Sequence, residues 1–136
     1  MQTLVVAARI GGGLLVLAAG ALHLWLYFDY FHRVHVIGIL FLLNAATGAV
    51  IGITLLLSSH PLAATAGIGY AVATLTGFFL SVSVGLFGYV ESLTGPYQEA
   101  AGAIELAAIV LLLPVALAGM RLRAGRGWWH PSRARS

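Results

Sequence analysis

Four long apolar stretches dominate the chain, and each is long enough to cross a lipid bilayer as a helix. They cover residues 5–28, 36–57, 64–90 and 100–120, and a helix needs roughly 20 apolar residues to span the hydrocarbon core. Hydrophobic residues make up 60% of the 136 positions and charged residues only 8%. This composition excludes both a soluble domain and a disordered chain. The sequence therefore predicts an all-α integral membrane protein.

Short polar connections separate the four stretches, and short connections place consecutive helices antiparallel. We therefore predict an up-down-up-down four-helix bundle over residues 1–120, followed by a basic tail over residues 121–136. The first apolar stretch is longer than the core of a signal peptide. We expect it to be retained as a membrane span rather than cleaved.

The arginines predict the orientation of the bundle. In the predicted topology Arg33 lies on one side of the membrane, whereas Arg9 and the five arginines of the tail share the other side with both termini. Arginine accumulates on the cytoplasmic side, so we expect both termini to be cytoplasmic and the plasma membrane to be the location. The tail is expected to contact anionic lipids, and nucleic acid is not an expected partner because no folded basic domain accompanies it.

Small residues recur every fourth position in the spans, which favours close packing of helices in lipid. The third span shows the longest such stripe, and the second span repeats the pattern at Asn44, Gly48 and Gly52. Packing within the bundle is the simplest interpretation, and a stripe that lines a ligand groove is the alternative. Any stripe left exposed is a candidate interface for a homo-oligomer or a larger membrane complex. The stripe of the third span consists of Gly69, Ala73, Gly77, Ser81 and Gly85.

Each span also carries one polar residue at a similar depth, about 8 to 12 Å from the predicted outer end at 1.5 Å per residue. Polar and ionisable groups inside a membrane are costly and often mark ligand sites or proton pathways. The predicted site, a ligand-binding or proton-handling cluster in the outer half of the bundle, consists of His23, Asn44, Ser81 and Glu105. Within it, Glu105 alone in hydrocarbon is expected to stay protonated, and a carboxylate–imidazole pair with His23 is the alternative. A hydrogen-bond network that fixes the helix register is the alternative interpretation.

The first outer connection contains a weaker candidate site. Asp29, His32 and His35 are spaced so that one helical turn brings them to a common face, and Glu91 in the third connection is a fourth candidate ligand. Imidazole and carboxylate groups suit zinc or copper, although an ordinary polar interface explains the same residues. Haem is not expected, because only His23 lies well inside a span.

No catalytic motif is present, so no catalytic residue is predicted. The chain has no Cys and no Lys, which excludes thiolate and Schiff-base chemistry. It also lacks nucleophile-elbow, phosphate-loop and zinc-protease motifs. We therefore expect no cofactor, with a metal or a quinone as the alternatives.

Several short motifs resemble one family of small four-span membrane proteins found in actinobacteria and some archaea. The matching segments are residues 21–24 around His23, residues 38–44 ending in Asn44, residues 77–88 of the third span, and a Glu in the fourth span. The resemblance implies a four-helix bundle with these polar positions, and it supplies no substrate.

Together these features predict a non-enzymatic membrane component, either an accessory protein or a protein that binds a small ligand. Two alternatives remain. One is a redox or quinone-linked protein in which His23 and Glu105 handle protons, and the other is a small oligomeric transporter.

Overall fold

A computed structural model describes residues 2–126 of the chain, with side chains described as far as Leu122. This part of the chain is helical and contains no strand. All four long helices are long and apolar enough to cross a membrane, which confirms the predicted all-α, four-span class. The elements are α1 (Gln2–Asp29), the 3-10 turn η1 (Phe31–Arg33), α2 (His35–Leu57), α3 (Pro61–Ser83) and α4 (Pro96–Arg126).

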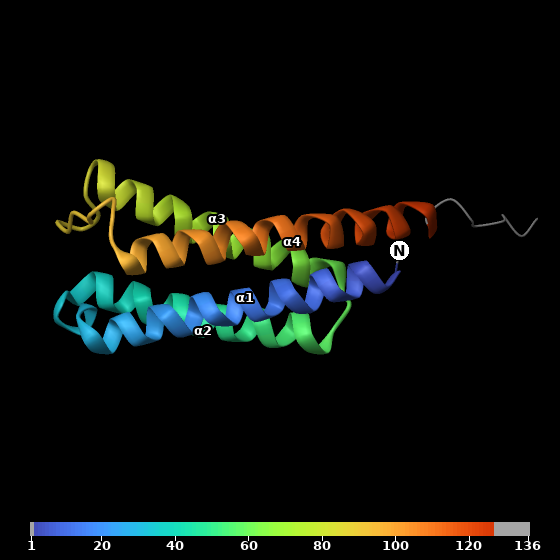
Figure 1. The fold of residues 1–136 in the computed structure, drawn as a ribbon, viewed down its shortest axis with the longest axis horizontal. Coiled ribbons are helices and arrows are strands. Elements are labelled where there is room, and N and C mark those ends of the chain that lie inside the picture. The colour runs from blue at the N-terminus through green and yellow to red at the C-terminus, as the bar shows by residue number, and fades with distance from the viewer. Residues whose placement is uncertain (1, 127–136) are drawn as a thin grey trace, which may run out of the picture.

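The four helices form two pairs, α1 with α2 and α3 with α4 (Figure 1). The pairs are joined mainly where α1 packs along α4, and α2 and α3 contact each other much less. The α1–α2 and α3–α4 connections lie at one end of the molecule, here termed the loop end. The N-terminus and the α2–α3 connection lie at the opposite end, here termed the terminal end (Figure 1).

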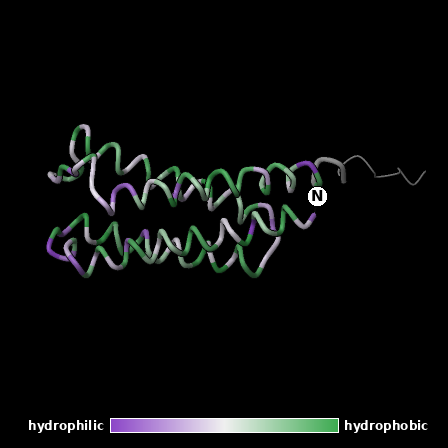
Figure 2. Tube along the Cα trace, in the orientation of Figure 1, coloured by the Kyte–Doolittle hydropathy of each residue, from purple (hydrophilic) through white to green (hydrophobic). Residues whose placement is uncertain are grey.

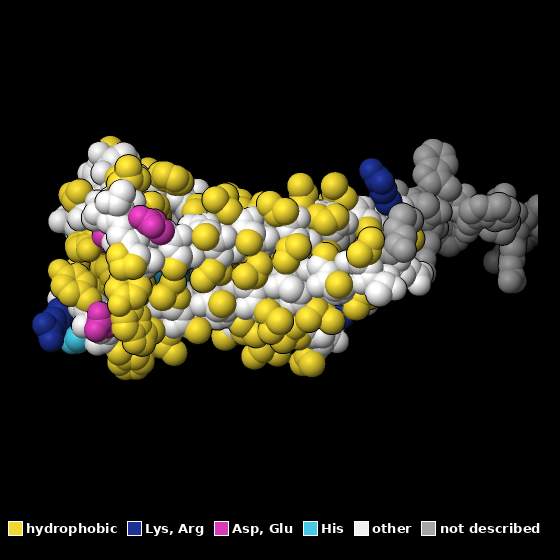
Figure 3. Space-filling view, in the orientation of Figure 1, with side chains coloured by type: hydrophobic (Ala, Val, Ile, Leu, Met, Phe, Trp, Pro, Cys, Tyr) yellow, Lys and Arg dark blue, Asp and Glu magenta, His cyan; other side chains and the backbone are white. Residues whose placement is uncertain are grey.

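The surface of the molecule is apolar along most of its length. Figure 2 shows hydrophobic residues along all four helices, with the most continuous hydrophilic stretch at the α1–α2 connection. On the face drawn in Figure 3, charged side chains lie toward the two ends and hydrophobic side chains cover the middle. An apolar surface of this kind suits contact with lipid. The helices also satisfy their own backbone hydrogen bonds, as a segment in hydrocarbon must.

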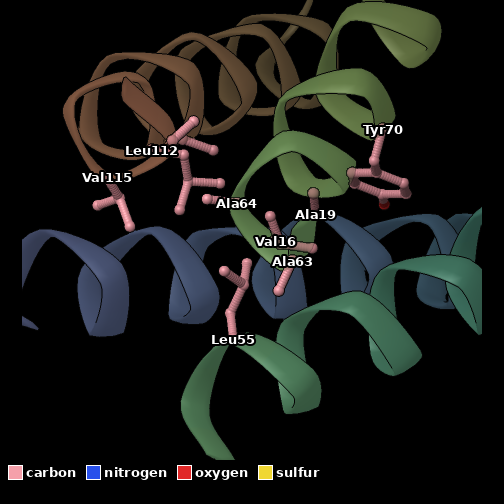
Figure 4. Packing of buried hydrophobic residues seen from close by; sticks show 10 residues of the cluster. Val16, Ala19, Leu55, Ala63, Ala64, Tyr70, Leu112 and Val115 are labelled. Carbon is pink, nitrogen blue, oxygen red and sulfur yellow. The ribbon is translucent and has the colours of Figure 1, made fainter. Parts of the chain in front are cut away.

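The hydrophobic core lies toward the terminal end, where side chains of all four helices meet (Figure 4). Val16 and Leu112 are fully buried, and Leu55 is 1% exposed. Small residues on α3 let α4 approach these side chains closely. The buried cluster consists of Val16, Ala19, Leu55, Ala63, Ala64, Tyr70, Ala108, Leu112, Val115 and Ala116.

Glycines bring α1 and α2 into close contact. A Cβ atom added at Gly52 would lie 2.5 Å from Cγ of Leu17 and 3.0 Å from the carbonyl oxygen of Gly13. One added at Gly48 would lie 3.1 Å from Cα of Gly20. The predicted packing role of small residues is therefore confirmed for the first two spans.

The same prediction is wrong for much of the α3 stripe. No atom lies within 4 Å of the Cβ position of Gly69 or Gly77, and Gly69 and Ala73 are exposed. Helix α3 instead packs through a different face, which includes Gly67 and Ala71. The sequence spacing indicates which residues share a face, but not which face meets a neighbour.

The third span ends earlier than predicted. Helix α3 stops at Ser83 rather than at residue 90, because the backbone at Gly85, Phe87 and Gly88 adopts positive φ angles of 80°, 51° and 81°. Leu86 and Tyr89 exchange two backbone hydrogen bonds of 2.7 and 2.9 Å across this turn. Positive φ angles at the two central residues of a turn, here Phe87 and Gly88, are typical of a tight reversal of the chain. Residues 84–90 therefore form a loop although they are apolar.

The fourth helix is longer than predicted at both ends, extending from Pro96 to Arg126 rather than over 100–120. The first six residues of the predicted basic tail are therefore helical. The rest of the tail, residues 127–136, lies outside the described part of the chain, as do the side chains of Arg123 and Arg126.

Arg9 joins the first two helices at the terminal end. Its Nη1 donates hydrogen bonds to the carbonyl oxygens of Leu55, of Leu56 at 3.2 Å and of Ser58 at 3.0 Å. These carbonyls lie at the C-terminal end of α2, where the last turn has no intrahelical donors left. A positive charge at that position also complements the helix dipole. Arg9 therefore caps α2 in addition to its predicted influence on orientation.

Replacement of Arg9 by Gln is expected to lower the free energy of unfolding by about 1–3 kcal/mol, because part-buried hydrogen bonds from a charged donor to the end of α2 are lost. Chemical unfolding in detergent micelles measures the change. Arg33→Gln is the matched control, since Arg33 is exposed and, within the described part of the chain, its side chain donates only to His32. Equal losses in the two variants would contradict the capping role.

Candidate functional site

A cavity of about 670 Å³ lies toward the loop end, and all four helices contribute to its lining. Pockets that hold small molecules usually measure about 300–1,000 Å³. The structure brings the four residues of the predicted polar cluster to this one cavity. His23, Asn44, Ser81 and Glu105 all line it.

Asn44 holds α2 against α3 at the wall of the cavity. Its Nδ2 donates to Oγ1 of Thr74 at 2.7 Å, and its Oδ1 accepts from the hydroxyl of Tyr70 at 2.5 Å. Thr74 in turn donates to the backbone carbonyl of Tyr70 at 3.0 Å. These contacts satisfy both polar atoms of the Asn44 amide, which favours a structural role for this member of the cluster.

Lining residues of the cavity are exposed on two parts of the surface. Along the helices these are Leu40 and Leu43 of α2 and Ala73 of α3, and at the loop end they are Asp29, Tyr30 and Tyr97. The exposed lining residues named along α2 and α3 are apolar, so this part of the lining suits contact with an apolar molecule.

His23 lies on the α1 side of the cavity and is buried. Its Nδ1 lies 2.8 Å from the carbonyl oxygen of Ala19, and this contact makes Nδ1 the donor atom of the ring. The ring packs against Phe41 with a centroid distance of 4.9 Å. Nε2 has no hydrogen-bond partner among the described residues.

Glu105 is the most deeply buried acidic residue of the site, with a side chain only 2% exposed. Its Oε1 atom is buried and has no hydrogen-bond partner within residues 2–122. The carboxylate–imidazole pair with His23 is not formed, because neither Oε1 of Glu105 nor Nε2 of His23 has a hydrogen-bond partner among the described residues. The structure leaves an uncompensated carboxyl group at the wall of the cavity.

The connection after α3 forms the rim of the cavity. Ser81 donates to the backbone carbonyl of Tyr89 at 3.4 Å, and its own carbonyl accepts from the backbone N–H of Glu91 at 3.3 Å. Ser81 thus anchors this connection to the last turn of α3. Its predicted depth was an overestimate, because α3 ends only two residues later.

Glu91 is held at the rim by three donors. Its carboxylate accepts from the backbone N–H of Ser92 at 2.8 Å, from Gln98 at 3.1 Å and from the hydroxyl of Tyr89 at 3.3 Å. Burial, together with the negative charge of Glu91, raises the pKa of the Tyr89 phenol to about 12. The phenol therefore remains protonated and donates to the carboxylate.

The predicted metal site is not assembled. No group of three His, Asp or Glu side chains in the described part of the chain is arranged to hold a metal ion. His32 instead lies 3.1 Å from the carbonyl oxygen of Tyr27 through Nδ1 and accepts from Arg33 at Nε2. Asp29 and Glu91 line the cavity, whereas His32 and His35 do not.

Sequence analysis missed the aromatic part of the site. Tyr70 bonds to Asn44, and Phe31 stacks on Phe41 with a centroid distance of 4.1 Å and meets Tyr89 edge-on at 5.4 Å. One sequence feature indicates that Tyr70 belongs to the site. Its spacing from Thr74 and Ser81 places the three residues near one face of α3.

Comparison of the chain with protein-family models, with curated proteins and with solved structures finds no match. The function is therefore inferred from the geometry of the cavity.

Proposed function

We propose that the protein is a membrane-embedded, non-enzymatic binding protein for a small lipophilic molecule with one polar group, and that the cavity at the loop end is its binding site. The observation that carries this proposal is the buried carboxyl group of Glu105. It lines a cavity of suitable size, and its Oε1 has no partner within the described residues.

A purely structural role explains Glu105 poorly. An unsatisfied buried polar group costs about 1–3 kcal/mol, and no described protein group supplies the compensating hydrogen bond to Oε1 of Glu105. Asn44 and Ser81 are satisfied by protein contacts, whereas Glu105 is not. A ligand whose polar group reaches Glu105 and whose apolar body fills the rest of the cavity recovers this cost.

The proposed orientation places the loop end outside the cell and the terminal end in the cytoplasm of a plasma-membrane protein. It is supported by the arginine bias of the sequence, since Arg33 alone belongs to the loop end and six arginines belong to the terminal end or the tail. In this orientation the cavity lies in the outer half of the bilayer.

The proposed binding site predicts that filling the cavity blocks ligand uptake without unfolding the protein. Gly102 lines the cavity, and no atom lies within 4 Å of its Cβ position. We expect Gly102→Leu to lower saturable photolabelling of cavity-lining peptides by a neutral phenyldiazirine probe at least about tenfold, equivalent to ~1.4 kcal/mol of binding free energy. Labelling is measured in lipid nanodiscs by peptide mass spectrometry.

Gly69→Leu is the matched control for this variant. Gly69 also has no atom within 4 Å of its Cβ position, but it is exposed and does not line the cavity. Both variants change one helical glycine to the same residue, so labelling of the Gly69 variant is expected to match the wild type. Unsaturable labelling, or labelling that Gly102→Leu leaves unchanged, contradicts the proposal.

A further inference from the structure

The acidic residues of the chain are concentrated at the cavity. Three of the four, Asp29, Glu91 and Glu105, line it, and Glu99 alone does not. The chain has no Lys, and no Arg among the described side chains lines the cavity. The only basic group in the lining is the imidazole of His23, which directs its donor atom away to Ala19. An anionic ligand would therefore meet three carboxyl groups and no fixed positive charge.

The three carboxyl groups are not equivalent. Glu91 already accepts three hydrogen bonds, and Asp29 is exposed at the end of α1. Glu105 is 2% exposed and has an unpartnered oxygen. A charge–charge contact is strongest where the dielectric constant is lowest, so the attraction between a cation and a carboxylate is screened least at Glu105.

Aromatic rings form much of the lining of the cavity. Seven rings line it in addition to that of His23 and suit an organic cation, because the face of an aromatic ring attracts positive charge. The exposed lining residues Leu40, Leu43 and Ala73 provide contact for an apolar body. The seven rings belong to Tyr30, Phe31, Phe41, Tyr70, Phe78, Tyr89 and Tyr97.

We infer that the ligand is a lipophilic organic cation, such as an ammonium group on a hydrocarbon body, whose positive charge lies against the carboxylate of Glu105. This inference rests on the proposed function and specifies its ligand class. The same chemistry occurs in the headgroup of an aminophospholipid and in a free lipophilic amine.

The test uses two probes of the same shape and opposite charge, tetraphenylphosphonium and tetraphenylborate. The protein is placed in phosphatidylglycerol nanodiscs, which contain no amine, and binding to empty nanodiscs is subtracted. We expect saturable binding of tetraphenylphosphonium and none of tetraphenylborate. Glu105→Gln keeps the shape of the side chain and is expected to weaken tetraphenylphosphonium binding at least about tenfold. Glu99→Gln, on the same helix but outside the cavity, should bind as the wild type does.

The outcomes separate this inference from the proposed function. Equal binding of the two probes, unchanged binding by Glu105→Gln, or no saturable binding of tetraphenylphosphonium overturns the cationic ligand class. If the neutral diazirine probe still labels the cavity, the proposed function stands without it. If that labelling is also absent, the proposed function fails. Diazirine labelling of Glu105→Gln shows in the same experiment that the variant retains its cavity.

Addition of phosphatidylethanolamine to the nanodiscs identifies the source of the cation. Displacement of tetraphenylphosphonium indicates that a lipid headgroup is the ligand, whereas retention of the probe indicates a free lipophilic amine. Both results support the cationic class.

Discussion

Glu105→Leu is expected to stabilise the protein while eliminating its ability to bind a cation. The wild-type carboxyl group is buried with an unpartnered oxygen, and leucine occupies a similar volume without a polar atom. Removal of the unsatisfied group should raise the free energy of unfolding by about 1–3 kcal/mol. Chemical unfolding in micelles measures the stability, and tetraphenylphosphonium binding measures the loss of function.

Glu99→Leu provides the comparison, because Glu99 is exposed in the first turn of α4 and its replacement should change stability little. A fall in stability for Glu105→Leu would show that the carboxyl group belongs to a stabilising network. The register-fixing interpretation of the polar cluster would then be preferred to ligand binding.

Gly52→Val is expected to cause the largest loss of stability among the variants considered. A Cβ atom at this position would lie 2.5 Å from Leu17 and 3.0 Å from the backbone oxygen of Gly13, so α1 and α2 must separate to admit a side chain. Overpacking of this kind typically lowers the free energy of unfolding by about 1–3 kcal/mol. Because the backbone of Gly13 cannot move as freely as a side chain, we expect a loss of stability of about 3 kcal/mol. Thermal unfolding followed by circular dichroism measures it.

Gly69→Val is the appropriate control, since it makes the same change in a helix where no atom lies within 4 Å of the Cβ position. Both substitutions alter helix propensity alike, and the difference between them isolates helix packing. Equal stability of the two variants would show that close contact of α1 and α2 contributes little.

The length of the apolar stretches was enough to predict the four helices, because a helix needs about 20 apolar residues to cross a bilayer and few other structures require such long apolar runs. It could not predict where α3 ends. Residues 84–90 are as hydrophobic as the span before them, but the positive φ angle at Gly85 ends the helix and those at Phe87 and Gly88 reverse the chain. Hydropathy reports the preference of side chains for lipid and says nothing about backbone conformation.

Depth was enough to predict that the four polar residues line one cavity, because antiparallel spans share one axis and residues at similar depth lie near one level. Only Ser81 lies closer to the end of its helix than predicted. The choice of partner also depends on how each helix is rotated. Asn44 therefore bonds to Tyr70 and Thr74 rather than to His23 or Glu105. The metal prediction failed for a related reason, since sequence neighbours such as His32 and His35 did not reach the cavity.

The contacts between α1 and α2 have a consequence for biosynthesis. The glycine contacts and the capping of α2 by Arg9 all fall within residues 9–58, so the first half of the chain carries a complete packing interface of its own. This pair can assemble as a helical hairpin as soon as it leaves the ribosome and enters the membrane. The later pair then docks on a preformed surface of α1, and the cavity is completed only when the last helix is in place.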